Sequence, residues 1–251
     1  MRCFAEVLVH LKDAKMKRQF INYAHRGASE YAPENTMLAF YLGMYMGANG
    51  IETDVHLTKD GVAVLFHDDT LERVTGAPGT VSDYTLEQLQ QIFVKKGDLV
   101  DRIPTLTDFL DHFAFRDITL AIELKQQGTA KVVADILRSY HIQHKVVVTS
   151  FKLEELRVLR EYAPEFETGH LKKEFSEELV QEMRQLGITE ICPLAANISK
   201  EMVDKYHAMG FRVRAWGVAT PECMRQAYEA GVDGMTVNFP DILCRYIQEG
   251  V

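Results

Sequence analysis

The chain has 251 residues, of which 47% are hydrophobic and 25% are charged, a composition typical of a soluble globular protein. Because 36 acidic residues outnumber 28 basic ones, the formal charge of −8 argues against non-specific nucleic-acid binding and against a polybasic membrane contact. The four cysteines form no Cys-x-x-Cys pair, which argues against a zinc knuckle or a redox pair and predicts a reduced, cytoplasmic protein.

The apolar runs predict neither a membrane span nor a signal peptide. The longest run, 37–48, is shorter than the ~20 residues that a span needs. Glu6, His10 and Lys12 interrupt the apolar residues near the start, and no small-residue cleavage site follows. We therefore expect no stable membrane anchor, an N-terminal extension over 1–19 to which no role can be assigned, and one domain over 20–251. The sequence leaves the oligomeric state open.

The first predicted elements are a strand over 21–24 and a helix that ends near Gly47, capped by Asn35 or Thr36. A second strand covers 51–55. The Asp60-Gly61 pair then predicts a turn, after which 62–66 returns antiparallel to the second strand as a hairpin. The stretch 69–105 is the longest without a predicted strand; it contains a short helix capped within 82–85. A further helix starts at Thr105 or Thr107 and runs through His112.

From there strands and helices alternate to the end of the chain. Strands are predicted over 118–124, 145–149, 166–170, 190–192, 212–216 and 234–237, and helices near 129–140, 152–161, 175–186, 199–209, 220–230 and 240–249. With the strands at 21 and 51, and the returning hairpin strand set aside, eight βα units predict a single (β/α)8 barrel of the triosephosphate-isomerase type. An open doubly wound sheet is the alternative, but no G-x-G-x-x-G or P-loop follows the first strand.

Glu52 and Asp54 lie two residues apart on the second strand, so both side chains face the same way. Two carboxylates in an apolar interior repel each other unless one is protonated or a cation lies between them. Oxygen ligands suit a hard divalent ion, either Mg²⁺ or Ca²⁺. The alternative is an edge strand with both acids in water, which the apolar neighbours Ile51 and Val55 disfavour.

Further charged residues follow the ends of other predicted strands, where the active sites of such barrels lie. Glu123 follows an apolar run, and we interpret it as a metal ligand in preference to a surface acid. Lys125 shares its face, either as a structural salt bridge to Glu123 or as an anion-binding group beside the metal. Arg26, after a strand-end histidine, is placed to bind phosphate or carboxylate.

His25 and His67 are predicted to form an acid–base pair, because imidazole titrates near neutral pH. His56 is expected to support the site from outside or to be exposed, and His170 is a weak candidate. Trp216 is either core or an apolar wall for an organic part of the substrate.

Several motifs together resemble the glycerophosphodiester phosphodiesterase family over about residues 20–247. They are His25-Arg26-Gly27 with Pro33-Glu34-Asn35-Thr36, Glu52-Thr53-Asp54-Val55 with Leu57-Thr58-Lys59-Asp60-Gly61, His67-Asp68, Glu123-Leu124-Lys125, Ser150-Phe151, Trp216, Gly231-Val232-Asp233-Gly234 and Pro240-Asp241. Each motif alone is weak, but the set in this order is highly specific.

The resemblance implies a metal-dependent hydrolase that cleaves glycerophosphodiesters to glycerol 3-phosphate and an alcohol. It implies that one divalent cation, Mg²⁺ or Ca²⁺, is bound by Glu52, Asp54 and Glu123; that His25 and His67 are the acid–base pair; and that Arg26, Lys125 and Trp216 contact the substrate. The stretch 69–105 corresponds to the family's small insertion. We take His67 as the base and His25 as the acid.

Departures from the family pattern lie at Gly217-Val218-Ala219 and at Asn238, where an acid is common, and they bear on the preferred alcohol. A lysophospholipase D or sphingomyelinase D-like lipid phosphodiesterase is the main alternative; the latter is disfavoured because no secretory segment, disulfide pattern or exposed apolar loop is evident. A non-catalytic phosphodiester-binding barrel would be expected to lack one of these histidines or acids. A zinc amidohydrolase would need histidine ligands that are missing.

Overall fold

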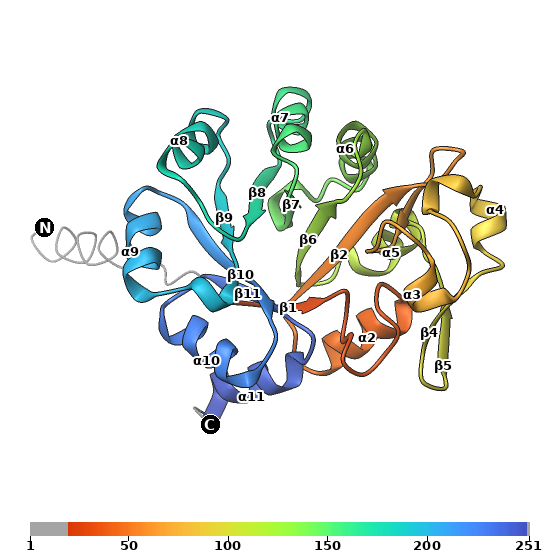
Figure 1. Ribbon diagram of the computed structural model, residues 1–251, viewed down its shortest axis with the longest axis horizontal. Helices are drawn as coiled ribbons and strands as arrows, with labels where there is room; N and C mark the ends of the chain where they lie inside the picture. Colours follow the sequence, from red (N-terminus) through yellow and green to blue (C-terminus); the bar gives the residue numbers. More distant parts are fainter. Residues whose placement is uncertain (1–19, 250–251) are drawn as a thin grey trace, which may run out of the picture.

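Eight parallel strands close into a barrel in the computed structural model, which describes residues 20–249 (Figure 1). They are β1 (Ile21–His25), β2 (Gly50–Leu57), β6 (Thr119–Leu124), β7 (Val146–Ser150), β8 (Glu167–Lys172), β9 (Glu190–Pro193), β10 (Arg212–Val218) and β11 (Gly234–Val237). The barrel closes because β1 pairs with both β11 and β2. The predicted fold is therefore confirmed, whereas the extension predicted over 1–19 lies outside the described residues.

Helices surround the barrel and follow the strands in turn. They are α2 (Met37–Tyr45), α5 (Leu106–Phe113), α6 (Thr129–Ser139), α7 (Leu153–Tyr162), α8 (Glu177–Gln185), α9 (Lys200–Ala208), α10 (Pro221–Glu229) and α11 (Pro240–Glu249). Thr36, and not Asn35, caps α2, since its hydroxyl accepts the Ala39 N–H. Hydroxyl caps also start α5, α8, α9 and α10, so polar side chains fix the first residue of each of these four helices. Within residues 20–249 no helix combines the length and apolar character needed to cross a membrane.

The predicted hairpin return is confirmed as β3 (Ala63–Leu65), which runs antiparallel to β2. Val55 lies opposite Leu65, and Leu57 lies opposite Ala63. Because β3 travels back along β2, the chain that follows it delivers His67 to the end of the barrel where β2 carries its acids. The returning strand β3 thus lies outside the ring of eight parallel strands.

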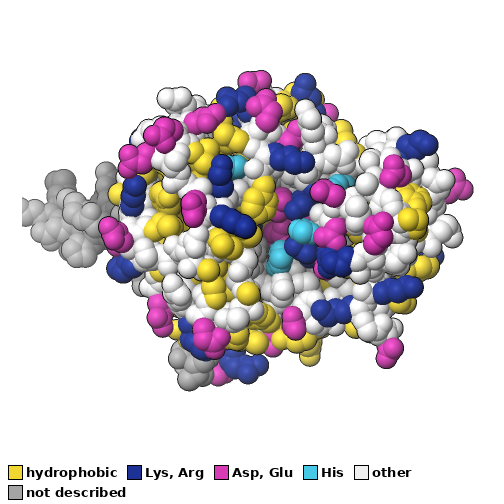
Figure 2. All heavy atoms as spheres, in the orientation of Figure 1, with side chains coloured by type: hydrophobic (Ala, Val, Ile, Leu, Met, Phe, Trp, Pro, Cys, Tyr) yellow, Lys and Arg dark blue, Asp and Glu magenta, His cyan; other side chains and the backbone are white. Residues whose placement is uncertain are grey.

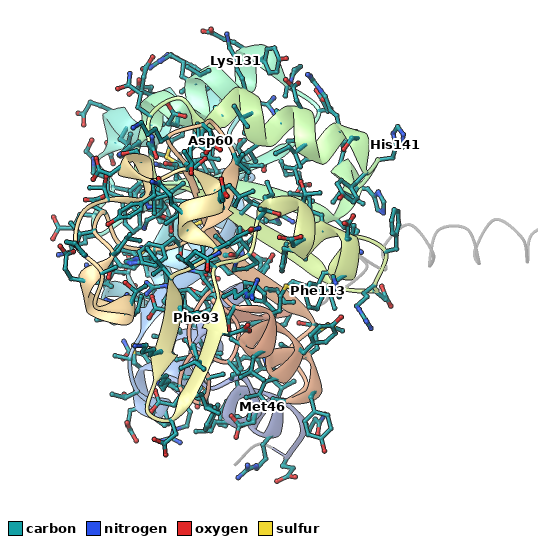
Figure 3. All side chains as sticks on the ribbon, turned by 90° about the vertical axis from the view of Figure 1, so that its right-hand side faces the viewer. Met46, Asp60, Phe93, Phe113, Lys131 and His141 are labelled. Atoms are coloured by element: carbon teal, nitrogen blue, oxygen red, sulfur yellow. The ribbon has the colours of Figure 1, made fainter. Side chains whose placement is uncertain are left out.

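The segment 69–105 differs from the prediction that it holds no strand. It contains α3 (Glu72–Thr75), α4 (Leu86–Leu89) and a two-stranded antiparallel ribbon, β4 (Phe93–Lys96) with β5 (Leu99–Arg102), on the side of the molecule that Figure 3 faces. The ribbon turns at Gly97, whose φ of +58° suits glycine. A separate small core of Val64, Phe66, Leu71, Val81, Leu89, Val94 and Ile103 supports the segment.

The ribbon also exposes apolar side chains, contrary to the expectation that no exposed apolar loop is present. Phe93, Leu99 and Val100 are 40%, 44% and 55% exposed. Lys96 Nζ donates a hydrogen bond to the carbonyl of Ser29, which ties the ribbon to the loop that follows β1. The ribbon therefore lies beside the loop that carries Arg26.

A cluster of buried charge occupies the N-terminal end of the barrel interior. Arg214, 1% exposed, donates from Nε to Glu190 Oε2 at 3.2 Å, and its guanidinium lies over the Tyr23 ring at 5.0 Å. Nearer the surface at the same end, the partly buried Arg212 pairs with the exposed Glu167. These four charged side chains form two oppositely charged pairs.

Candidate active site

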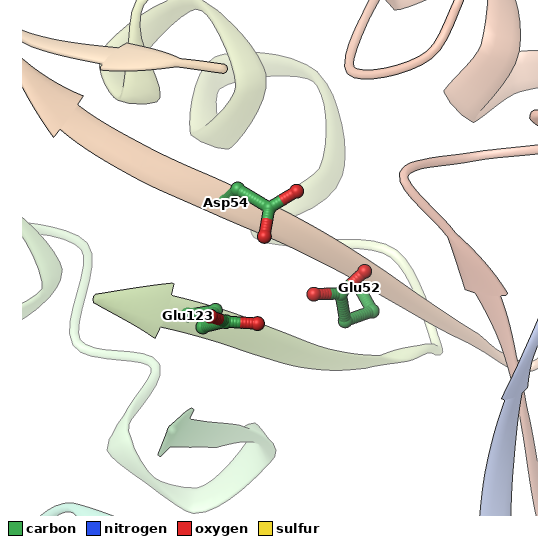
Figure 4. A group of neighbouring side chains, drawn as sticks. All are labelled: Glu52, Asp54 and Glu123. Carbon is green, nitrogen blue, oxygen red and sulfur yellow. The ribbon is translucent and has the colours of Figure 1, made fainter. Parts of the chain in front are cut away.

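Three carboxylates converge inside the C-terminal end of the barrel (Figure 4). Glu52 and Asp54 project from β2 and Glu123 from the adjacent β6, whose register places Glu123 beside Asp54. One oxygen from each lies within 4.8 Å of the others, and all three side chains are buried. The alternation of strand side chains, read from the sequence, therefore does bring these acids together.

The electrostatics of this cluster favour a bound cation. Burial and the charges of Asp54 and Glu123 raise the pKa of Glu52 well above its usual value. Burial and the charge of Asp54 likewise raise the pKa of Glu123 to about 7. Asp54 Oδ1 is buried and has no hydrogen-bond partner among the described residues. Three close carboxylates with an unsatisfied buried oxygen fit a hard divalent metal ion, whose charge would keep all three ionised.

Two cationic side chains reach the cluster. Arg26 Nε lies 3.3 Å from Asp54 Oδ2, and Lys125 Nζ lies 2.8 Å from Glu123 Oε1 and 3.6 Å from Asp54 Oδ1. Although burial alone would raise the pKa of Asp54, these two cations outweigh it and hold that pKa well below its usual value. Both cations thus lie where an anion beside a metal ion would meet them.

His67 enters the site from the loop after β3 with its ring oriented by a carboxylate. Its Nδ1 lies 2.7 Å from Asp68 Oδ1; since a carboxylate only accepts, Nδ1 carries the proton and Nε2 keeps its lone pair. Burial lowers the pKa of His67. His56 is buried, not exposed, and its Nε2 donates to the carbonyl oxygen of His67 at 3.3 Å, so it supports the loop.

His25, at the end of β1, has a neutral partner. Its Nδ1 donates to Asn238 Oδ1 at 2.6 Å, and its Nε2 lies 3.9 Å from Glu52 Oε2. Burial and the neighbouring Arg26 lower the pKa of His25 to about 4. From the sequence, Asn238 was expected to affect only which alcohol is preferred. In the structure it orients His25.

Two more residues of this network, Glu34 and Asn35, were not predicted to belong to the site. Glu34 Oε1 accepts from Arg26 Nη1 at 2.9 Å. Asn35, at a φ of +54°, donates from Nδ2 to Asp54 Oδ2 at 2.9 Å. Both lie in the Pro33–Thr36 motif, so the only signal in the sequence was their place in that motif.

A cleft of about 340 Å³ opens beside the carboxylates, and His67, Glu123, Lys125 and Phe151 are among its lining residues. Figure 2 shows histidine, basic and acidic side chains gathered around a hollow on this face. Phe151, 42% exposed, packs edge-on against Trp216 with ring centroids 4.8 Å apart. Phe151 thus forms the apolar side of the cleft, and Trp216 packs behind it.

His170, the weak candidate, does not join the site. It is buried, and its Nδ1 donates to the carbonyl oxygen of Ser150 at 2.9 Å. A groove of about 360 Å³ between α8 and α9 is lined by Phe175, Val180 and Tyr206 among others, away from the carboxylates. The chemistry is therefore concentrated in the cleft beside Glu123.

Comparison with protein families matches residues 25–242 to the glycerophosphoryl diester phosphodiesterase family. The chain belongs to this family. A glycerophosphodiester phosphodiesterase from Caldanaerobacter subterraneus is 33% identical over 236 residues, which cover 90% of this chain and 97% of the relative. The predicted family and the predicted enzyme class are thereby confirmed.

Solved structures agree with this membership. A glycerophosphodiester phosphodiesterase from Thermotoga maritima, 26% identical, aligns with a TM-score of 0.76 and covers 90% of this enzyme and 97% of that chain. A phosphodiesterase from Oleispira antarctica, solved in complex with the product sn-glycerol-3-phosphate, is 24% identical with a TM-score of 0.79 and covers 90% and 96%. The latter shows the shared fold.

Proposed function

We propose that this enzyme hydrolyses glycerophosphodiesters to glycerol 3-phosphate and an alcohol, with one divalent cation and two histidines. The observation that carries the proposal is the convergence of Glu52, Asp54 and Glu123 within 4.8 Å at a cleft that also presents His67. The Oleispira phosphodiesterase of the same fold was solved with glycerol 3-phosphate, which supports this product. The substrate is a small molecule, and no nucleic acid is required.

Glu52, Asp54 and Glu123 would hold the ion, Mg²⁺ or Ca²⁺, since carboxylate oxygens suit both. When bound, the ion would neutralise charge that grows on the phosphoryl oxygens. Arg26 and Lys125 would bind the same anion, because both side chains already point at the carboxylate cluster. A phosphodiester would therefore be drawn in by local charge against the enzyme's net charge of −8.

His67 and His25 would move the protons. In the first step a free glycerol hydroxyl attacks phosphorus, and His67 Nε2 takes the hydroxyl proton. The bond from phosphorus to the alcohol oxygen breaks, and protonated His25 gives its proton to that oxygen. Because the pKa of His25 is lowered to about 4 in the empty site, the negative charge of the bound diester would be needed to favour the protonated ring. Water then opens the cyclic phosphate with the two roles exchanged, which returns both rings to their starting states. General acid–base terms of this kind contribute ~10²–10⁴-fold.

Trp216 and Phe151 would shape the apolar side of the cleft against the carbon skeleton of the substrate. The two rings pack edge to face, so each restricts the orientation of the other. Since Lys125 Nζ lies 5.8 Å from the Phe151 ring, the apolar wall and the anion-binding group are neighbours. A molecule with a phosphate next to a short carbon chain fits this pairing.

The test is glycerol 3-phosphate release from glycerophosphocholine by purified enzyme with Mg²⁺, Ca²⁺ or EDTA, beside His25→Ala and Glu52→Ala. We expect metal-dependent release that both variants lose. A diester lacking the free glycerol hydroxyl should not turn over, and comparable cleavage of it would favour direct attack by water. No release from any common glycerophosphodiester by folded, metal-bound protein would refute the proposal.

One observation supports a second candidate, a lysophospholipase D activity. The exposed Phe93, Leu99 and Val100 belong to a ribbon tied to the Ser29 loop beside Arg26. Apolar side chains there could contact an acyl chain that a soluble diester lacks. Choline release from lysophosphatidylcholine that Val100→Asp reduces, with glycerophosphocholine turnover unchanged, would establish it.

A further inference from the structure

Arg73 lies on α3 in the segment 69–105, outside the barrel strands that carry the three acids. Its guanidinium engages two carboxylates that belong to two different loops. Nη1 and Nη2 donate to Glu34 Oε2 and Oε1 at 2.9 and 2.6 Å, and Nε donates to Asp68 Oδ2 at 2.5 Å. A planar guanidinium is suited to such a fork, whereas an amine can offer only a point charge.

Each of these carboxylates uses its contacts to hold a residue of the active site. Asp68 accepts from Arg73 through Oδ2 and from His67 Nδ1 through Oδ1. Because Arg73 fixes the plane of the Asp68 carboxylate, it also fixes the direction of the hydrogen bond that Asp68 accepts from His67. The His67 ring is thereby kept in the tautomer with a free Nε2 lone pair.

The second arm reaches Arg26. Glu34 Oε1 accepts from both Arg73 Nη2 and Arg26 Nη1, so two guanidinium groups share one carboxylate. Arg26 is also held near Asp54 and through its backbone N–H to Glu52. Because Arg73 also binds Glu34, part of the negative charge of Glu34 is neutralised outside the site. Glu34 therefore positions Arg26 but competes less with a bound anion for the Arg26 guanidinium.

We propose that Arg73 is a positioning residue that aligns His67 through Asp68 and Arg26 through Glu34, so that the insertion completes the active site. This inference rests on the proposed function. Since the Arg73 side chain is half-exposed, its ion pairs contribute little to folding stability, and its removal should act on catalysis. A displacement of about 1 Å in a catalytic group can cost about 10²-fold in rate.

The first experiment compares kcat and KM of wild type, Arg73→Ala and Arg73→Lys on glycerophosphocholine. Arg102→Ala is the matched control, since Arg102 is an exposed arginine of the same insertion whose guanidinium lies near the Phe93 ring. We expect Arg73→Ala to lower kcat/KM about 10²-fold, Arg73→Lys to lower it less, and Arg102→Ala to leave it unchanged. Millimolar guanidinium should restore part of the Arg73→Ala activity and none of the activity of a His67→Ala variant.

Double variants separate alignment from simple loss of charge. If Arg73 acts on His67 through Asp68, Arg73→Ala should no longer lower kcat in the Asp68→Asn background. If it acts on Arg26 through Glu34, Arg73→Ala should no longer raise KM in the Glu34→Gln background. In a variant that carries both changes, Arg73→Ala should cost less than about 3-fold. Equal losses in all backgrounds, or wild-type kinetics for Arg73→Ala, would overturn the proposal. Loss of the folded state in both Arg73→Ala and Arg73→Lys would assign Arg73 a structural role and overturn it as well.

A second measurement keeps the inference separate from the proposed function. Long-range ¹⁵N–¹H spectra report the tautomer of His67, identified by the signal that His67→Ala removes. We expect one Nδ1-protonated form in the wild type and a mixture of tautomers in Arg73→Ala. If the wild type turned over no diester, the proposed function would fail. The tautomer result would still decide whether Arg73 aligns His67, with an unchanged spectrum counting against it.

Discussion

The barrel interior holds a cluster of buried charge at each end, and the two clusters differ in how their charges are matched. At the N-terminal end, the buried Arg214 pairs with the buried Glu190, and nearer the surface Arg212 pairs with the exposed Glu167. At the C-terminal end, three carboxylates meet two cations, Arg26 and Lys125, among the described residues. A buried cluster that is balanced within the protein supports the fold, whereas one left with surplus negative charge marks a place for a cation.

The largest expected effect is at the balanced end. Arg214→Met leaves Glu190 charged and buried without its partner, and breaking such a pair costs about 3–5 kcal/mol. Urea unfolding measures this loss. The double variant Arg214→Met/Glu190→Gln should recover more than half of it, because no unpaired charge remains. A cost for Arg214→Met below about 1 kcal/mol would mean that the cluster contributes little.

At the other end, metal binding should stabilise the wild type. An ion present at about 100 times its Kd adds about 2.7 kcal/mol to the free energy of unfolding, if it binds only the folded state. Thermal or urea unfolding with Mg²⁺, Ca²⁺ and EDTA measures the difference. Asp54→Asn is the control and should abolish the shift. An equal shift in Asp54→Asn would place the ion elsewhere.

In the metal-free enzyme, the stabilising contribution of the acid cluster should fall as pH rises from 5 to 7.5. Glu52 and Glu123 both have raised pKa values, that of Glu123 about 7 against 4.5 when unfolded, so the folded state holds protons that the unfolded state releases. The stabilising contribution of Glu123 is full below about pH 4.5 and is lost as pH rises through about 7, and about 2 kcal/mol of this decline falls between pH 5 and 7.5. Urea unfolding of wild type and Glu123→Gln in EDTA, at pH 5 and at pH 7.5, separates this decline from the opposite contribution of His25 and His67, whose pKa values are lowered. The stability advantage of wild type over Glu123→Gln should fall as pH rises, and saturating metal should remove the fall. A difference between the two proteins that is constant over this range would contradict the assignment.

The smallest effect comes from one substitution made at both ends. In EDTA at pH 7.5, Glu52→Gln removes an acid whose ionised form is disfavoured by burial and by its neighbouring carboxylates, so it should stabilise the fold by about 1 kcal/mol while metal binding is lost. Glu190→Gln leaves Arg214 unpaired and should destabilise it. The informative result is the opposite sign of the two changes in urea unfolding. Two losses of similar size would show that the acids at both ends are equally well paired.

The sequence could predict the barrel because short strand-like segments alternate regularly with helical ones along the chain and most helices begin at a hydroxyl cap. Strand alternation and the rule that sites lie at strand ends were enough to group Glu52, Asp54 and Glu123. The ribbon β4–β5 was missed because Lys95-Lys96-Gly97-Asp98 interrupts its apolar pattern with charge. Such a ribbon is recognised only from its pairing in three dimensions.

The hydrogen-bond and packing partners of the site residues could not be predicted from the sequence either. Asn238 is 213 residues from His25, and Arg73 is 39 residues from Glu34, so no local pattern relates them. Phe151 followed a strand end, but its contact with Trp216 depends on two strands that are distant in the chain. Strand ends predict which residues gather at a rim, while the side-chain rotamers decide which of them touch.

The insertion packs around a small core of seven buried apolar residues, five of its own together with Val64 and Phe66 from the hairpin, and this core is distinct from the two larger clusters around the barrel. Regions with small separate cores open more readily than the main core in hydrogen exchange. The three acids lie on barrel strands, whereas Arg73 and the loop of His67 adjoin this smaller unit. The three acids therefore stay in place as long as the barrel is folded, whereas the alignment of His67 by Arg73 lasts only while the insertion is closed. Local opening of the insertion thus limits the fraction of molecules that can catalyse the reaction at any moment.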